Sequence, residues 1–208
     1  MISGREALRE LREGNDRYVR GAPSLTEVAD DARRSDLVDG QAPFAIVLGC
    51  SDSRVPTEIV FDQGLGDLFV IRVAGNVVAP SQIGSVEFAA GKFGTRLVVV
   101  LGHTRCGAVL ATLEELRRPS EDQSPNLRSI VDRVRPSVEP LLAADFGGDG
   151  RALEEAAVRA NVKASGDQLR HGSELIEELV RRDGLLIVEA VYSLETGRVD
   201  FFDVPVGG

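Results

Sequence analysis

The chain has 208 residues, of which 43% are hydrophobic, and this length and composition are typical of one ordinary globular domain. Its formal net charge of -9 argues against nucleic acid as a partner, because proteins that bind a phosphate backbone present basic faces. No stretch approaches the roughly twenty apolar residues that cross a bilayer, so we expect no membrane association.

The N-terminus is predicted to form a helical arm. Ser3 and Glu6 have the spacing of a capping box, and Leu8 and Leu11 continue a narrow apolar stripe. Because the stripe is narrow, we expect this helix to lie across a neighbouring subunit rather than complete its own core. Residues 24–40 are polar and turn-rich, which indicates a long connection. The first residues lack the apolar core of a signal peptide, which predicts a cytoplasmic protein; a secreted protein whose signal has been removed would look the same.

Apolar strands then alternate with amphipathic helices. Strands are predicted at residues 44–50, 67–73, 96–102 and 185–192. Helices are predicted at residues 56–61, 81–93, from 107 onward, 124–136 and 151–183. The nearly continuous Val, Ile and Leu runs indicate strands buried on both faces. The predicted architecture is therefore α/β, with a central, mostly parallel β-sheet flanked by helices.

Turn-forming residues set the expected boundaries in the second half of the chain. Pro136 is expected to end its helix, and residues 143–150 are dense in Gly and Asp, which predicts a loop. The long helix that follows is expected to break near residues 165–166 and again near 171–172, where glycines occur.

The chain is predicted to close with a hairpin at the sheet edge. The segment Glu195-Thr196-Gly197 is predicted to form the turn that connects the last long strand to a short strand at residues 198–202. The sequence contains no internal repeat, low-complexity tract or second domain. We therefore expect a single catalytic domain over residues 1–208, with residues 1–40 as its helical arm and connection.

Two motifs follow apolar runs that are predicted to be buried strands: Cys50-Ser51-Asp52-Ser53-Arg54 and His103-Thr104-Arg105-Cys106. Both cysteines of the chain and one of its two histidines fall within these motifs. The carboxyl ends of parallel strands meet at one edge of a sheet, so the two motifs are expected to meet in space. Thiolate and imidazole are ligands that zinc prefers, which predicts one zinc site containing Cys50, His103 and Cys106.

Ordinary structural roles are the alternative for these residues. A free cysteine often serves as a small buried hydrophobic residue, and a lone histidine more often makes a structural hydrogen bond than binds a metal. The two cysteines could also form one disulfide, although the three-residue spacing of His103 and Cys106 favours metal ligation.

Asp52 and Arg54 are predicted to form a switch beside the metal. Asp52 is two residues from Cys50, close enough to take the fourth zinc position or to accept a hydrogen bond from zinc-bound hydroxide. The planar guanidinium of Arg54 matches a carboxylate in two hydrogen bonds and would hold it ionised. A carboxylate held in this way leaves room for water, whereas a free one closes the site. The alternative is a surface salt bridge, which would contribute little.

These residues resemble the β-class carbonic anhydrases, whose two signatures are Cys-x-Asp-x-Arg and His-x-x-Cys. The likeness covers nearly the whole chain, including residues 62–67 and 72–76. It implies that zinc is held by Cys50, His103 and Cys106, with water or Asp52 in the fourth position. The implied reaction is reversible hydration of carbon dioxide to bicarbonate by hydroxide on the zinc. The resemblance also implies a homodimer or a higher homo-oligomer, with the site at the subunit interface.

The resemblance assigns further residues to substrate binding. Gln41 matches a position whose amide donates a hydrogen bond to a substrate oxygen, and Gly107 one whose backbone N–H lies near the substrate. Phe69 and Ala74 would line a small apolar pocket. Phe88 stands where many plant-type members have a tyrosine from the partner subunit, so that hydroxyl contact is lost. Without the resemblance, Gln41 is a solvated loop residue and Gly107 a turn glycine.

One regulatory feature of some bacterial-type members is expected to be weak or absent. Their second bicarbonate site uses a tryptophan where this chain has Val47, although Arg72 matches the arginine of that site.

Three other functions are alternatives for a sequence with these motifs. A family member with a changed substrate, such as carbon disulfide, would carry the same motifs. A non-catalytic protein with a structural zinc would use Asp52 as a permanent fourth ligand. A nucleotide-binding domain is disfavoured, because no Gly-x-Gly-x-x-Gly or P-loop motif follows any predicted strand.

Overall fold

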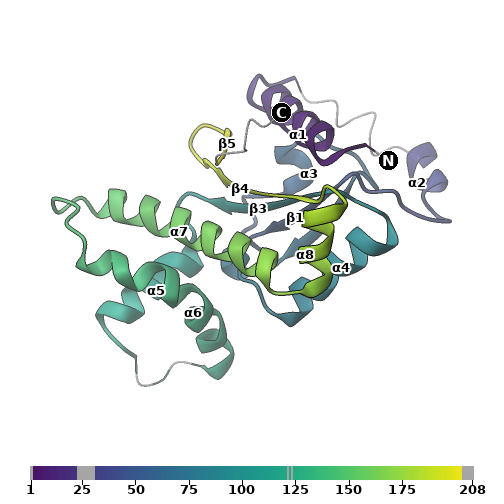
Figure 1. The fold of residues 1–208 in the computed structure, drawn as a ribbon. Coiled ribbons are helices and arrows are strands. Elements are labelled where there is room, and N and C mark those ends of the chain that lie inside the picture. Colours follow the sequence, from purple (N-terminus) through teal and green to yellow (C-terminus); the bar gives the residue numbers. More distant parts are fainter. Residues whose placement is uncertain (1, 23–30, 121, 123, 203–208) are drawn as a thin grey trace.

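A computed structural model describes residues 2–22, 31–120, 122 and 124–202. Its centre is a five-stranded sheet with the strand order β2-β1-β3-β4-β5 (Figure 1). The strands are β1 (Ala45–Gly49), β2 (Leu68–Arg72), β3 (Leu97–His103), β4 (Leu186–Tyr192) and β5 (Val199–Phe201). The first four pair in parallel, and β5 alone runs antiparallel as the edge of a hairpin. The prediction of a mostly parallel α/β sheet with a closing edge hairpin is confirmed.

The two central strands explain why their sequences are apolar without alternation. Every residue of β1 and β3 is buried, because helices cover both faces of the sheet. In the register between them, Gly49 lies beside Leu101. The chain segments that follow β1 and β3 therefore leave the sheet at the same edge.

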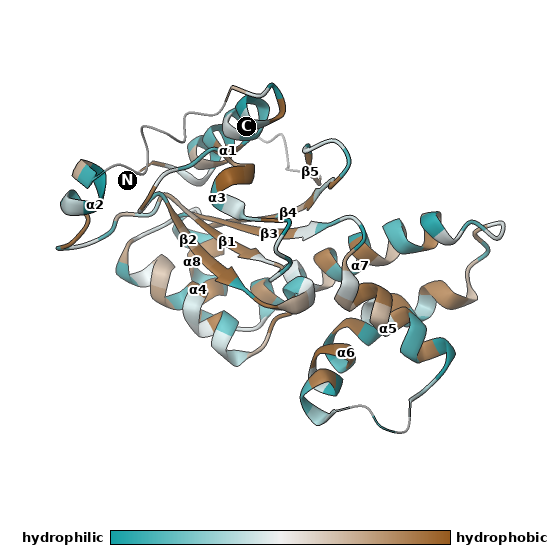
Figure 2. Cartoon of the chain, turned by 180° about the vertical axis from the view of Figure 1, so that it is seen from behind, coloured by the Kyte–Doolittle hydropathy of each residue, from teal (hydrophilic) through white to brown (hydrophobic). Residues whose placement is uncertain are grey.

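Helices form a layer on each side of the sheet (Figures 1 and 2). One core contains alternate strand residues such as Ile46 and Leu48, covered by α4 (Pro80–Lys92), α7 (Gly150–His171) and α8 (Glu174–Arg182). Further helices extend that layer: α5 (Gly107–Arg117), α6 (Pro125–Val138) and the short 3₁₀ turns η1 (Ala74–Asn76) and η2 (Glu139–Ala143). The opposite core is covered by α1 (Gly4–Val19) and α3 (Thr57–Val60). Among the described helices, none is both long and apolar enough to cross a bilayer.

The structure corrects two expectations about the N-terminal arm. Ala7, Leu8 and Leu11 are buried in the chain's own second core, so the narrow stripe of α1 covers its own sheet rather than that of a neighbour. The predicted connection 24–40 contains a short helix, α2 (Asp31–Asp36), whereas residues 23–30 lie outside the described part.

Two predicted helix ends are also wrong. Helix α6 continues past Pro136 to Val138, because Val134 and Val138 are both fully buried on its inner face. Helix α7 is unbroken at Gly166, where an added Cβ would lie 1.9 Å from Oε1 of Glu189 on β4. This glycine gives space to a strand carboxylate rather than ending the helix. The second predicted break is confirmed, since α7 ends at His171 and α8 begins at Glu174.

Candidate metal centre

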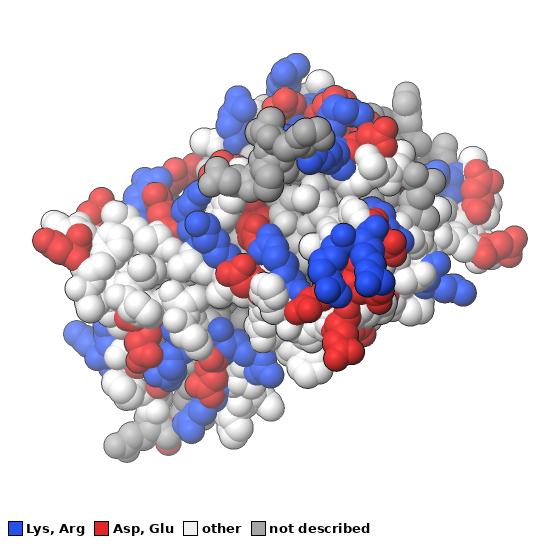
Figure 3. Space-filling view, viewed as in Figure 1, with Lys and Arg blue, Asp and Glu red and all other residues white. Residues whose placement is uncertain are grey.

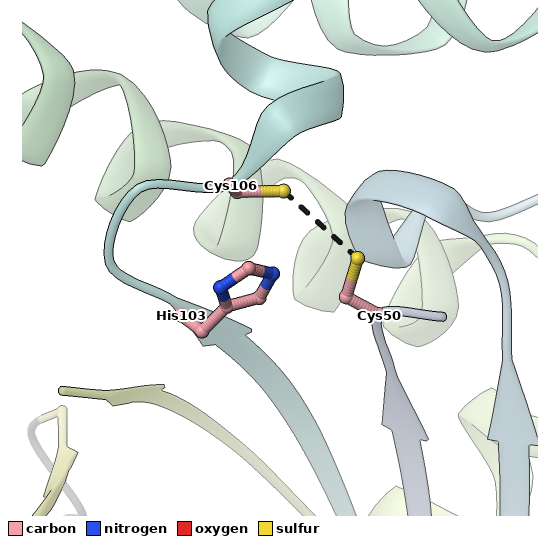
Figure 4. A group of neighbouring side chains, drawn as sticks. All are labelled: Cys50, His103 and Cys106. Atoms are coloured by element: carbon pink, nitrogen blue, oxygen red, sulfur yellow. Dashed lines mark hydrogen bonds between the residues drawn. The ribbon is translucent and has the colours of Figure 1, made fainter. Parts of the chain in front are cut away.

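Three side chains with metal-binding atoms converge at the edge where β1 and β3 end (Figure 4). Cys50 directly follows β1, His103 is the last residue of β3, and Cys106 immediately precedes α5. The two Sγ atoms are 4.0 Å apart, and all three donor atoms lie within 4.8 Å of one another. All three residues are buried. The strand register therefore brings together the donors that lie in two separate motifs.

The state of the His103 ring fits a metal ligand. Its Nδ1 lies 3.0 Å from the carbonyl oxygen of Thr104, a contact that places the ring proton on Nδ1. Its Nε2 is buried and has no hydrogen-bond partner within the described chain. A buried nitrogen without a partner is costly unless a metal accepts its lone pair. A tetrahedral zinc would separate two thiolates by about 3.8 Å, close to the distance found here.

A hydrogen bond links the sulfur atoms of Cys50 and Cys106. A hydrogen bond from Cys106 lowers the pKa of Cys50, and the backbone N–H of Gly75, 3.3 Å from its Sγ, acts in the same direction. The pKa of Cys106 is raised, because it donates that bond and is buried. The first backbone N–H groups of α5 favour its thiolate, as helix N-termini do. A cation between the sulfurs would take the place of this hydrogen bond.

Asp52 and Arg54 form a two-pronged ion pair next to the donors. Nε and Nη2 of Arg54 donate to the two carboxylate oxygens at 2.9 and 2.7 Å, and the backbone N–H of Arg54 donates at 3.0 Å. These bonds hold the pKa of Asp52 well below its usual range. Oδ2 of Asp52 lies 3.7 Å from Nε2 of His103. The carboxylate thus faces the donor group while Arg54 holds it.

Two residues outside the predicted metal site hold the loop after β1 and the turn after β2 in place. Arg72 donates to the carbonyl oxygens of Cys50 and Asp52 at 3.0 and 2.6 Å. Buried Asn161 on α7 donates to the carbonyl oxygen of Gly75 at 2.8 Å. The position of Arg72 at the end of a predicted strand was the one available signal for such a role. Nothing in the sequence near Asn161 points to the metal centre.

The predicted substrate residues fall into two groups. Ala74 and Gly107 lie beside the donors, since one precedes Gly75 and the other follows Cys106. Phe69 on β2 packs with Phe88 and Phe93, and its ring centroid lies 6.2 Å from that of Phe88 and 6.1 Å from that of Phe93.

Gln41 is not brought to the metal centre within one chain. It is exposed and precedes β1, whereas Cys50 follows the same strand. Gln41 therefore lies toward the amino end of β1, whereas Cys50 lies at the carboxyl end of that strand.

Comparison with known proteins gives one consistent family. Residues 45–199 match the family model described as carbonic anhydrase. The chain is 40% identical to carbonic anhydrase 2 of Mycobacterium tuberculosis, covering 92% of this chain and 89% of that protein. It is 42% identical to the carbonic anhydrase of Mycolicibacterium smegmatis, covering 93% and 91%. Among solved structures, the β-carbonic anhydrase CcaA has a TM-score of 0.72 at 27% identity, covering 95% of this chain and 85% of that one. A tetrameric β-carbonic anhydrase from Sordaria macrospora has a TM-score of 0.70 at 25% identity, covering 82% and 86%.

Proposed function

This chain belongs to the β-class carbonic anhydrases, and we infer that it catalyses the reversible hydration of carbon dioxide to bicarbonate and a proton. The main observation behind this inference is the buried set of metal donors formed by Cys50, His103 and Cys106. This set lies beside the ionised carboxylate of Asp52. No other described group of three or more His, Cys, Asp or Glu side chains offers such a set.

Zinc is the metal that we propose for this set. Two thiolates and one imidazole suit zinc, and three protein ligands leave a fourth position for chemistry. When bound, zinc would supply Lewis-acid activation of water near neutral pH. The buried site supports this role, because apolar side chains around the donors restrict the access of other ligands.

Asp52 is proposed to accept a hydrogen bond from the reacting water and to keep it oriented. Arg54 holds both carboxylate oxygens, which directs Asp52 away from direct ligation. If the ion pair opened, the carboxylate could occupy the fourth position and close the site. A purely structural zinc would need Asp52 as a permanent ligand, and the observed pairing with Arg54 disfavours that alternative.

We propose that substrate is contacted both by residues beside the metal donors and by residues across a subunit boundary. The backbone N–H of Gly107 would donate to a substrate oxygen, and Ala74 would form part of the apolar wall. We propose that the pocket is completed across a subunit boundary by Gln41, Phe69 and Phe88. The reason is that Gln41 lies toward the amino ends of the strands in its own chain, whereas the metal donors lie at the carboxyl ends. This arrangement makes a homo-oligomer necessary for a complete site.

The exposed aromatic ring of Phe88 supports such an assembly. It is 53% exposed although it belongs to a cluster with Phe69 and Phe93. The Phe88→Ser variant is expected to weaken self-association by about 10-fold or more, since burial of a phenylalanine contributes about 1.5–3 kcal/mol. Light scattering after size-exclusion chromatography over a concentration series measures this. Leu127→Ser on α6, at a residue 59% exposed, is the matched control and should associate like the wild type. A wild-type monomer, or an unchanged Phe88→Ser assembly, contradicts the prediction.

We propose that the protein works in the cytoplasm as one catalytic domain over residues 1–208, of which residues 1–40 form the arm and connection. A site with two thiolate ligands requires reduced cysteines, and a reducing compartment maintains them.

Stopped-flow hydration of carbon dioxide against pH tests the function on zinc-loaded protein, with metal content determined on the same sample. Activity is expected to rise between about pH 7 and 9, because zinc lowers the pKa of water toward neutrality. Asp52 does not titrate in this window, since Arg54 holds its pKa well below the usual range. Full zinc content without activity at any pH would contradict the proposed reaction.

A further inference from the structure

The turn between β4 and β5 supports the loop that carries two of the donors. The backbone N–H of Thr104 donates to the carbonyl oxygen of Tyr192 at 3.0 Å. The hydroxyl of Thr104 accepts a hydrogen bond from the backbone N–H of Leu194 at 3.0 Å. The segment from His103 to Cys106 is therefore attached to this turn, far from it in sequence.

Glu195, in the same turn, binds two arginines at once. One carboxylate oxygen accepts a hydrogen bond from Arg105 at 2.7 Å, and the other accepts one from Arg151 at the start of α7 at 2.8 Å. Arg151 also pairs with Glu155 at 3.0 Å. Arg151 and Arg105 lower the pKa of Glu195, so both contacts remain ionic.

Arg105 connects this ion pair to the Asp52 switch. Its φ of 55° lies in the left-handed region, which a non-glycine residue keeps only where its surroundings hold it. Its carbonyl oxygen accepts a hydrogen bond from Nη2 of Arg54 at 3.4 Å. The same peptide unit carries the N–H of Cys106. A rotation of Arg105 would therefore disturb the partner of Arg54 and the position of a metal donor together.

Ionic contacts join the turn to α7 through Glu195 and Arg151. A hollow of about 460 Å³ lies between them, and its lining includes Glu195, Arg151 and Thr104. Acidic and basic side chains are intermingled over the surface seen in Figure 3. At this place the carboxylate of Glu195 joins the turn to both α7 and the segment that carries Arg105.

We propose that Glu195 is a positioning residue for the reaction: by holding Arg105, it favours the arrangement in which Arg54 retains Asp52 and the fourth metal position stays open. This inference rests on the proposed function. Glu195 itself need not touch substrate, because it acts through Arg105 and Arg54.

The Glu195→Gln variant tests this role. Glutamine keeps the size of the side chain but turns an NH₂ group toward one of the two arginines. We expect kcat to fall by about 2–5-fold, the scale of one exposed ion pair, with KM unchanged because a smaller fraction of molecules has an open site. Metal content and melting temperature should match the wild type. Glu195→Asp, which keeps the charge, should recover part of the lost kcat.

Asp200→Asn is the matched control. Asp200 forms a comparable ion pair with Arg159 at 2.7 Å on the same hairpin, but that pair does not involve Arg105. Its kcat and KM should equal those of the wild type. Equal behaviour of Glu195→Gln and Asp200→Asn overturns the proposal, as does a loss of kcat that only parallels a loss of metal or of melting temperature.

A spectroscopic measurement separates this proposal from the function on which it rests. In cobalt(II)-substituted protein, the visible absorption bands depend on the fourth ligand. Glu195→Gln should change these bands relative to both the wild type and Asp200→Asn, even if the wild type proved inactive toward carbon dioxide. Identical spectra for the three proteins would overturn the positioning role.

Discussion

Replacement of Cys106 with serine is expected to abolish metal binding and, with it, the hydration of carbon dioxide. A serine hydroxyl stays protonated near neutral pH and is a much weaker zinc ligand than a thiolate. Loss of a residue that merely supports a ligand lowers metal affinity by about 10–100-fold, so loss of the ligand itself should cost more. Zinc content after dialysis against a chelator, together with stopped-flow activity on the same sample, measures the effect.

The fold of the Cys106→Ser variant should survive. Cys106 is 1% exposed, and a substitution of this size costs about 1 kcal/mol in the free energy of unfolding. Circular dichroism of the metal-free proteins checks this point. Ser51→Ala, at an exposed residue next to Cys50, is the control and should keep both metal and activity. Wild-type zinc content and activity in Cys106→Ser would exclude Cys106 as a ligand.

The Asp52→Asn variant is expected to retain zinc but to lose most of its activity. Asparagine has nearly the same shape, yet it lacks the negative charge that Arg54 binds through two hydrogen bonds. We expect kcat/KM to fall by about 10²–10⁴-fold, the range typical of a side chain that handles a proton in the transition state. Arg54→Ala should have a similar effect, because the freed carboxylate can move onto the metal. Wild-type kcat/KM with full zinc content in Asp52→Asn would contradict the assigned role.

The ion pair also predicts how the wild type responds to acid. Because Arg54 lowers the pKa of Asp52 in the folded state, the pair stabilises the fold fully above the unfolded-state pKa of about 3.9. This contribution falls progressively as the pH drops below the unfolded-state pKa, and it is gone once the pH has passed below the lower folded-state pKa. Asp31→Asn removes the exposed pair with Arg34 on α2 and is the control for both activity and acid stability.

The strands and the donor set could be predicted because their signals are local. Continuous runs of Val, Ile and Leu identify buried strands, and the segments after β1 and β3 carry the motifs that contain Cys50, His103 and Cys106. Parallel pairing then requires these segments to leave the sheet at one edge. The ion pair of Asp52 with Arg54 was also predictable, since the two residues are close in sequence.

The contacts that support the donors depend on distant segments and could not be predicted in this way. Asn161 reaches Gly75 from 86 residues away, and Glu195 reaches Arg105 from 90 residues away. The continuous course of α7 depends likewise on Glu189, whose carboxylate lies where a side chain at Gly166 would stand. A local pattern indicates a helix break at such a glycine, whereas the cause is a neighbour on another element.

The separation of the donors along the chain also bears on how the protein matures. His103 and Cys106 belong to one short loop, but Cys50 reaches them only after β1 has paired with β3. A newly made chain thus offers at most a weak two-ligand site until the middle of the sheet has formed. If this set binds zinc, as we propose, uptake of the ion would therefore be a late event, and the bound ion would stabilise the folded chain by mass action. Removal of the metal would then favour the unfolded chain, which is the form that proteases degrade.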